Sequence, residues 1–166
     1  MKKVVGVVLI AIFLMVFILF LVRAFSDSEL DDVSPMIDCE EELLLKSDIL
    51  WVIPLFENQS ITKYSEWIKK IKSLNKTIGM HGIYHTYHEL DIDRNEEYFN
   101  LGINEFEKTF GVVKIFKPSH LSINFYNKKY LESRGFKVYG LWHQITRKVY
   151  HCSDTGKFPN GIIDLF

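Results

Sequence analysis

The sequence has little of what marks collagen-like, low-complexity or cysteine-rich proteins. It contains four Pro, nine Gly and two Cys among 166 residues, which excludes collagen repeats, disordered tails and a cysteine-based metal knuckle. It also lacks a basic excess, because 20 Lys and Arg against 21 Asp and Glu leave a net charge of -1. Proteins that bind nucleic acid need a basic footprint for the phosphates. We therefore exclude nucleic acid as a partner.

Charged and strongly polar side chains are missing from one long stretch, Val4 to Val22. At about 1.5 Å per residue a helix over this stretch reaches roughly 28 Å, close to the hydrocarbon thickness of a bilayer. Two lysines precede it and one arginine follows it, which favours a cytoplasmic N-terminus. We predict a membrane anchor over residues 1–23, single-pass in the cell membrane, with the rest of the chain extracytoplasmic. The alternative is a cleaved signal peptide, although Leu21 to Phe25 offer no small-residue cleavage site.

Segments of helical and strand-like pattern alternate from residue 38 onward. Apolar residues at spacings of three and four predict helices, and short apolar runs predict buried strands. The predicted helices cover 40–46 (with a capping box from Asp38 and Glu41), 61–74, 99–110 (ended by Gly111) and 124–134 (capped by Asn124). The predicted strands cover 49–53, 77–80, 112–116 and 136–142, with 148–152 and 161–166 as further candidates.

This alternation predicts an α/β fold with a parallel sheet. Four strands are too few for a complete eight-stranded barrel, which takes about 250 residues. We therefore expect a partial (β/α) barrel or small open sheet, with a domain over 38–166 that follows a juxtamembrane segment over 24–37. Cys39 and Cys152 could form one disulfide in an oxidising compartment, and two buried free thiols fit the sequence equally well.

Three of the six histidines stand close together at the end of the predicted strand 77–80. His81 and His85 are four residues apart, a spacing that can aim two imidazoles at one zinc ion. In parallel sheets the loops after the strands converge, so a third ligand can come from a distant part of the chain. The alternative is a polar loop with partly exposed histidines.

Two further segments carry residues suited to hydrolysis. In Asp31-Asp32-Val33-Ser34-Pro35, one carboxylate could complete a His-His-Asp metal site while its neighbour accepts a proton from water. The alternative is a solvated acidic linker, because no apolar strand precedes the pair. At the end of another strand, Lys117 could hold a catalytic carboxylate ionised.

Together these segments resemble the polysaccharide deacetylase, or NodB-homology, superfamily. The likeness covers residues 30 to about 140 and is strongest to a branch with "DDVSP" and "HG-x-x-H-x-x-x-E" segments. It implies a deacetylase-type partial barrel in which Asp31 is the general base, Lys117 replaces a motif arginine that braces it, and Asp32, His81 and His85 bind a divalent metal, with zinc the expected ion. The implied reaction removes an N-acetyl group from a glycan, or acts on another amide substrate.

The chain also departs from the family pattern. Arginine becomes Lys117, a second proline becomes Ser119, and the C-terminal leucine-x-histidine segment is missing before Phe166. That segment supplies the acid that protonates the leaving amine, and His143 or His151 could replace it only if the fold brings one close. We expect a membrane-anchored deacetylase with slow turnover. The alternatives are a non-catalytic protein of the same fold that binds metal, glycan or a protein partner, and a small membrane protein with no site.

Overall fold

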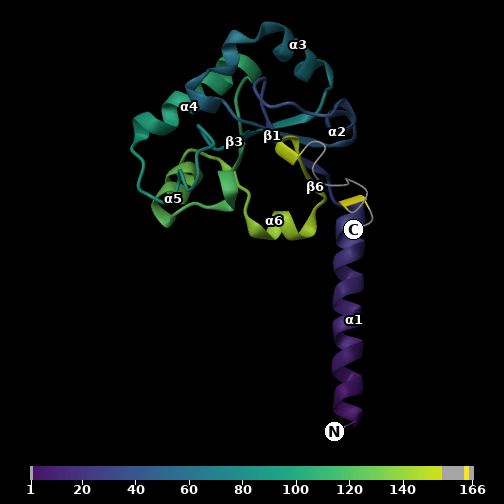
Figure 1. Cartoon of the computed structure of the whole chain (residues 1–166). Coiled ribbons are helices and arrows are strands. Elements are labelled where there is room, and N and C mark those ends of the chain that lie inside the picture. Colours follow the sequence, from purple (N-terminus) through teal and green to yellow (C-terminus); the bar gives the residue numbers. More distant parts are fainter. Residues whose placement is uncertain (1, 155–162, 165–166) are drawn as a thin grey trace.

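The N-terminal helix α1, Lys2–Phe25, projects from one side of a compact domain in the computed structural model, which describes residues 2–154 and 163–164 (Figure 1). Its part Val4–Phe25 is long and apolar enough to cross a membrane by length and composition, and none of it is buried against the domain. The expected apolar helix is therefore confirmed as a candidate span that carries no packing role in the core.

Within the described residues six parallel strands form the sheet, which confirms the predicted α/β fold. Their order across the sheet is β5-β4-β3-β2-β1-β6. The strands are β1 (Glu29–Val33), β2 (Ile49–Val52), β3 (Thr77–His81), β4 (Ile115–Lys117), β5 (Lys137–Val138) and β6 (Val149–His151). All four residues of β2 are buried, as its unbroken apolar run predicts for a strand covered on both faces.

Helices connect the strands and cover the sheet. They are α2 (Glu41–Lys46), α3 (Ser65–Ser73), α4 (Glu96–Phe110), α5 (Phe125–Ser133) and α6 (Leu141–Thr146), with short 3-10 turns at Phe56–Asn58, Ile61–Lys63, Ser119–Leu121 and Cys152–Asp154. The side chain of Asn124 accepts a hydrogen bond from the Asn127 amide and starts α5 as predicted. Gly111 ends α4 at φ 85°, a conformation that favours glycine.

Several local predictions are wrong. Helix α2 begins after Glu40 without a side-chain cap, so the capping box from Asp38 does not form. The predicted strand 112–116 begins only at Ile115. The strand predicted over 136–142 ends at Val138, because the chain leaves the sheet there and turns into α6. The candidate 148–152 is confirmed as β6, and the candidate 161–166 lies largely outside the described residues.

The Asp-Asp pair lies in β1, an interior strand between β2 and β6, and all five residues of β1 are buried. The alternative of a solvated acidic linker is therefore wrong for this pair, and the segment 24–37 contributes a strand to the sheet. The sequence does not predict this strand, because Glu29, Asp31 and Asp32 carry carboxylates, which are rarely buried unless they are paired. Their partners come from β3, β4 and β6, far along the chain.

Candidate metal and active site

A bulge in β1 turns both aspartates toward one cavity. Successive residues of a regular strand point to opposite faces. Against β2, however, Leu30 pairs with Leu50 and Val33 with Val52, so one extra residue is present in β1, and Asp32 adopts a left-handed conformation at φ 63°. As a result, Asp31 and Asp32 both line a cavity of about 340 Å³.

Asp32, His81 and His85 converge in this cavity. Oδ1 of Asp32 lies 3.3 Å from Nε2 of His81 and 2.9 Å from Nε2 of His85. One ligand atom from each of the three residues lies within 4.8 Å of the others. Asp32 and His81 are buried, and His85 is half-buried. The residues that the sequence predicts as metal ligands are thus brought together.

The surrounding chain fixes the two imidazoles. Nδ1 of His81 lies 3.1 Å from the carbonyl oxygen of Lys117, which can only accept, so Nδ1 donates and Nε2 keeps its lone pair for a metal. Gly82, at φ 59°, lies against the Glu89 carboxylate, and a Cβ there would come within 2.1 Å of Oε1. Glycine is therefore favoured at this position of the His-Gly-x-x-His segment for two reasons: the Glu89 carboxylate leaves no room for a side chain, and the backbone has a positive φ.

Glu89 holds the loop that carries His85. Its buried carboxylate accepts hydrogen bonds from the backbone amides of Ile83 and Tyr84 and from the hydroxyl of Ser119. These three donors and the Tyr98 hydroxyl, 3.0 Å from Oε2, compensate the cost of burying the carboxylate. Glu89 is the last residue of the "HG-x-x-H-x-x-x-E" segment, and it positions the loop from outside the predicted ligand set.

Asp31 is paired with Lys117. The Lys117 ammonium, fully buried, lies 2.8 Å from Oδ1 of Asp31 and 2.9 Å from Oε2 of Glu29. Glu29 also accepts hydrogen bonds from the Trp51 indole and the Arg147 guanidinium. This network of two carboxylates and two cations holds Asp31 in one orientation. Sequence reasoning found Lys117 but missed Glu29, whose only signal is its place two residues before Asp31.

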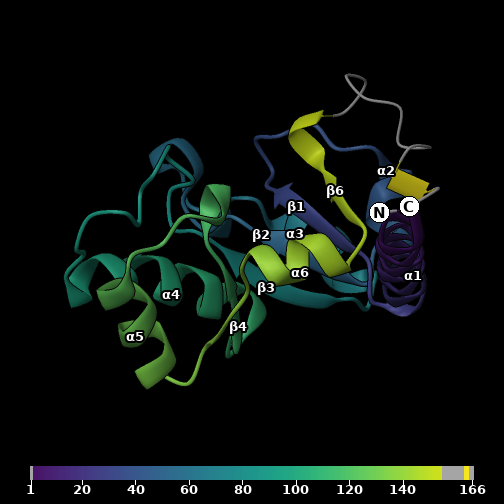
Figure 2. The same ribbon diagram turned by 90° about the horizontal axis from the view of Figure 1, so that it is seen from below.

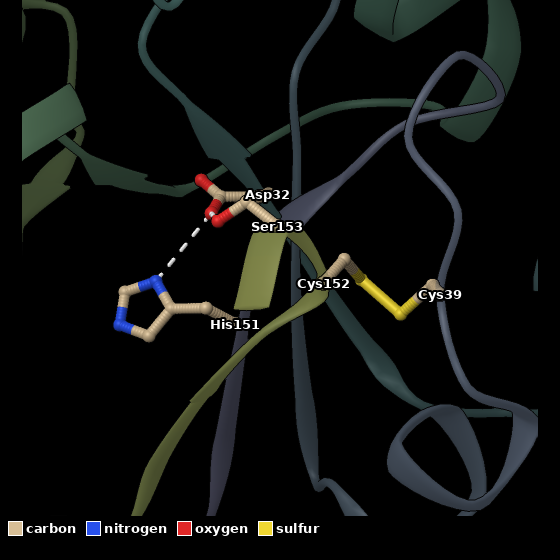
Figure 3. Close-up of a disulfide and its surroundings, with 5 residues drawn as sticks. All are labelled: Asp32, Cys39, His151, Cys152 and Ser153. Atoms are coloured by element: carbon tan, nitrogen blue, oxygen red, sulfur yellow. Dashed lines mark hydrogen bonds and ion pairs between the residues drawn. A yellow bond between two sulfur atoms is a disulfide. The ribbon is translucent and has the colours of Figure 1, made fainter. Parts of the chain in front are cut away.

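His151 and Ser153 reach Asp32 from the end of β6 (Figure 3). Nδ1 of His151 lies 3.4 Å from Oδ2 of Asp32 and 3.9 Å from Oδ2 of Asp31, and the Ser153 hydroxyl donates to Oδ2 of Asp32 at 2.5 Å. Cys152, between them, forms a disulfide with Cys39 in the loop after β1. Of the two alternatives for the cysteines, the structure contains the disulfide.

These contacts shift two pKa values in opposite directions. Burial alone would raise the pKa of Asp32, but its contacts with the His151, His81 and His85 imidazoles together hold it far below its usual range. Burial alone would lower the pKa of His151, yet its hydrogen bond to Asp32 and the charge of Asp31 raise it. The site thus favours an ionised carboxylate beside a readily protonated imidazole.

Further residues complete the cavity wall. Pro118, His120, Leu121 and Gln144 line it together with the aspartates, three histidines and Ser153. The His120 ring lies 5.3 Å from that of His85, between ring centroids. His143 does not line this cavity and stacks instead on Tyr139 at 4.1 Å. Of the two late histidines considered from the sequence, the fold brings His151 close and leaves His143 outside.

The donor set fits a divalent transition metal. Two imidazole nitrogens and one carboxylate oxygen are ligands that zinc takes in catalytic sites, where three protein ligands leave a position open. The fixed tautomer of His81 and the low pKa of Asp32 keep both groups in the form that binds a cation. The cavity of about 340 Å³ leaves room beside the three ligands for part of a substrate.

Three solved structures similar to this chain are described as deacetylases. A protein assigned as a polysaccharide deacetylase from Mycobacterium smegmatis is 20% identical, with a TM-score of 0.42, over 53% of this chain and 30% of its own. The Bc1960 peptidoglycan N-acetylglucosamine deacetylase is 16% identical, with a TM-score of 0.49, over 67% of this chain and 54% of its own. The polysaccharide deacetylase Bc1974 from Bacillus cereus is 16% identical, with a TM-score of 0.48, over 70% of each chain.

The chain thus spans about a third and about half of the length of the first two proteins. No family model and no curated protein matches the sequence. The three structures carry the same family description that the sequence motifs suggest. The chemistry of the site follows from the residues of this chain.

Proposed function

We propose that the protein is a membrane-anchored, metal-dependent hydrolase that removes N-acetyl groups from glycans. The observation that carries this proposal is the placement of the Asp32, His81 and His85 ligand atoms within 4.8 Å of one another, beside a second carboxylate held by a buried lysine. Amide hydrolysis needs a Lewis acid that polarises the carbonyl, a base and a proton donor; this cavity has residues that can hold a metal for the first role and a candidate residue for each of the other two.

The roles follow from the contacts. Asp32, His81 and His85 would hold a divalent metal, with zinc the expected ion, and a bound metal would polarise the amide carbonyl and lower the pKa of water. Asp31 lies next to the ligand set and would accept the proton of the attacking water, while Lys117, 2.8 Å from its Oδ1, orients it. One flexible ammonium orients a carboxylate less firmly than the planar fork of an arginine.

His151 would supply the acid. An amine leaves poorly as its anion, so a positioned proton donor commonly contributes about 10² to 10⁴-fold. The raised pKa of His151 favours the protonated imidazole, 3.9 Å from Asp31. The expectation of slow turnover assumed that no such acid reaches the site. With His151 in the cavity, we expect a complete acid-base pair.

Acetate release tests the function. The full chain in detergent micelles, loaded with zinc, should release acetate from N-acetylglucosamine oligomers, and Asp31→Asn should lower the rate by about 10² to 10⁴-fold while metal content is unchanged. Asp93→Asn, an exposed carboxylate outside the cavity, should behave like the wild type. Metal binding without acetate release from any acetylated glycan would support the alternative, a non-catalytic protein of this fold.

The anchor is part of the proposal. The apolar α1 supports a single-pass anchor, and the Cys39–Cys152 disulfide supports an oxidising, extracytoplasmic compartment for the domain. Protease added to intact cells should then cleave the domain, and the mature protein should keep its N-terminal lysines. A mature N-terminus near residue 25 would identify the segment as a signal peptide.

A further inference from the structure

Helix α6 presents an apolar face to solvent. Leu141 is 65% exposed, Trp142 72% and Ile145 40%. Residues three and four apart lie on the same side of a helix, and Trp142 and Leu141 stand at these spacings from Ile145, so the three side chains form one patch. An exposed tryptophan within an apolar patch costs solubility and marks a surface that contacts something apolar. We call these three residues the α6 patch.

The α6 patch lies where the apolar helix α1 leaves the domain. Figure 1 shows α6 on the side of the domain from which α1 projects, and Figure 2, seen from below, shows α6 beside α1. Helices α1 and α6 are in contact. Phe25, the last residue of α1, is 87% exposed at the same end.

Arg23 fixes this relationship. Its guanidinium donates to the carbonyl oxygen of Ile145 at 2.8 Å and to that of Gln144 at 3.5 Å. These carbonyls belong to the last turn of α6, which has no intrahelical donors for them. The final turn of the candidate span is therefore joined directly to the C-terminal turn of α6, and a bilayer around α1 would end beside the α6 patch.

We propose that the α6 patch docks on the lipid surface, with Trp142 seated at the boundary between headgroups and acyl chains. This inference rests on the anchoring role of α1 in the proposed function. Tryptophan is enriched at that boundary because its ring is apolar and its N–H is polar. An amphipathic helix lies in the same plane when its apolar side faces the acyl chains. Arg23 is also suited to the boundary, since its charged head can stay at headgroup level.

Docking would place the active site beside the bilayer. Gln144 of α6 lines the cavity that holds the metal ligands. One wall of this cavity would then be a helix about 10–12 Å in diameter, with lipid against the neighbouring face of the same helix. The substrate class that fits is an acetylated glycan attached to the membrane or lying directly against it, and a long polymer far from the membrane would have no access.

Tryptophan fluorescence of the full chain in vesicles tests the docking. The chain has three tryptophans, of which Trp51 is fully buried in the sheet and Trp67 lies on α3. The vesicles contain phosphatidylcholine and phosphatidylglycerol, with acyl chains brominated in one set to quench nearby indoles. We expect quenching of the wild-type chain that is lost in Trp142→Phe and kept in the matched control Trp67→Phe. Phenylalanine keeps the patch apolar, so the variant reports position without removing the docking surface.

Flotation of the same vesicles separates the possible failures. If the wild-type chain does not float with them, the anchor itself is wrong and the docking falls with it. If it floats but Trp142→Phe keeps the full quenching, the anchor stands and the docking is wrong. If Trp142 is shielded from aqueous iodide but not quenched by brominated lipid, a protein such as a second copy covers the α6 patch, and the lipid proposal is overturned.

Discussion

The ammonium of Lys117 and the carboxylate of Asp31 form a buried ion pair, 2.8 Å apart, that joins β4 to β1 across the sheet. Because Lys117 also faces Glu29, its removal would leave two buried carboxylates without this cation. We expect Lys117→Met to lower the free energy of unfolding by about 3–5 kcal/mol. Denaturant unfolding measures this, with the exposed Lys114→Met as the matched control. Equal losses for both variants would contradict a special role of the buried pair.

Metal binding should depend on the two histidines of the ligand set. We expect His81→Ala and His85→Ala to weaken zinc binding more than the roughly 10- to 100-fold typical of outer-shell changes, because each removes one of three direct ligands. Equilibrium dialysis with metal analysis measures the affinity. His88→Ala is the control, since His88 is exposed and pairs with Asp91 outside the ligand set. Unchanged zinc in all three variants would remove these histidines from the site.

Replacing His151 and His143 in turn tests which histidine acts as the general acid. We expect His151→Ala to lower kcat for acetate release by about 10² to 10⁴-fold with little change in KM, because proton donation to the amine occurs in the transition state. His143→Ala should keep the wild-type rate, since His143 does not line the cavity. The opposite ranking of the two variants would assign the acid to α6.

The disulfide should stabilise the domain and the site together. It joins residues 113 apart, and a cross-link over a loop of that size stabilises by about 2–5 kcal/mol. Thiol reduction should therefore lower the unfolding midpoint and slow turnover, because His151 and Ser153 flank Cys152. The double variant Cys39→Ser and Cys152→Ser should have the lower unfolding midpoint and the slower turnover without reductant, and adding reductant should change neither. A wild-type chain unaffected by reduction would show that β6 holds its place without the cross-link.

Sequence reasoning located the ligands because their signals are local. His81 and His85 follow a readable strand, and a resemblance linked them to Asp31, Asp32 and Lys117. It did not predict strand β1, because an acidic segment indicates a solvated linker unless the partners of its carboxylates are known. For Asp31 those partners lie 86 or more residues away. It also read the segment 136–142 as one strand, although its last two residues, Leu141 and Trp142, belong to the exposed α6 patch.

The position of β1 between β2 and β6 has a consequence for synthesis of the chain. Leu30 pairs with Leu50, made soon afterwards, and also with Tyr150, made near the end of the described residues. The partners of Asp31 and Asp32 are therefore synthesised one after another. His81 and His85 come first, Lys117 next and His151 last. Pairing over such separations slows folding. A nascent chain stopped before β6 would have the metal ligands but an open edge on β1, a surface that a chaperone, or a neighbouring chain, could occupy.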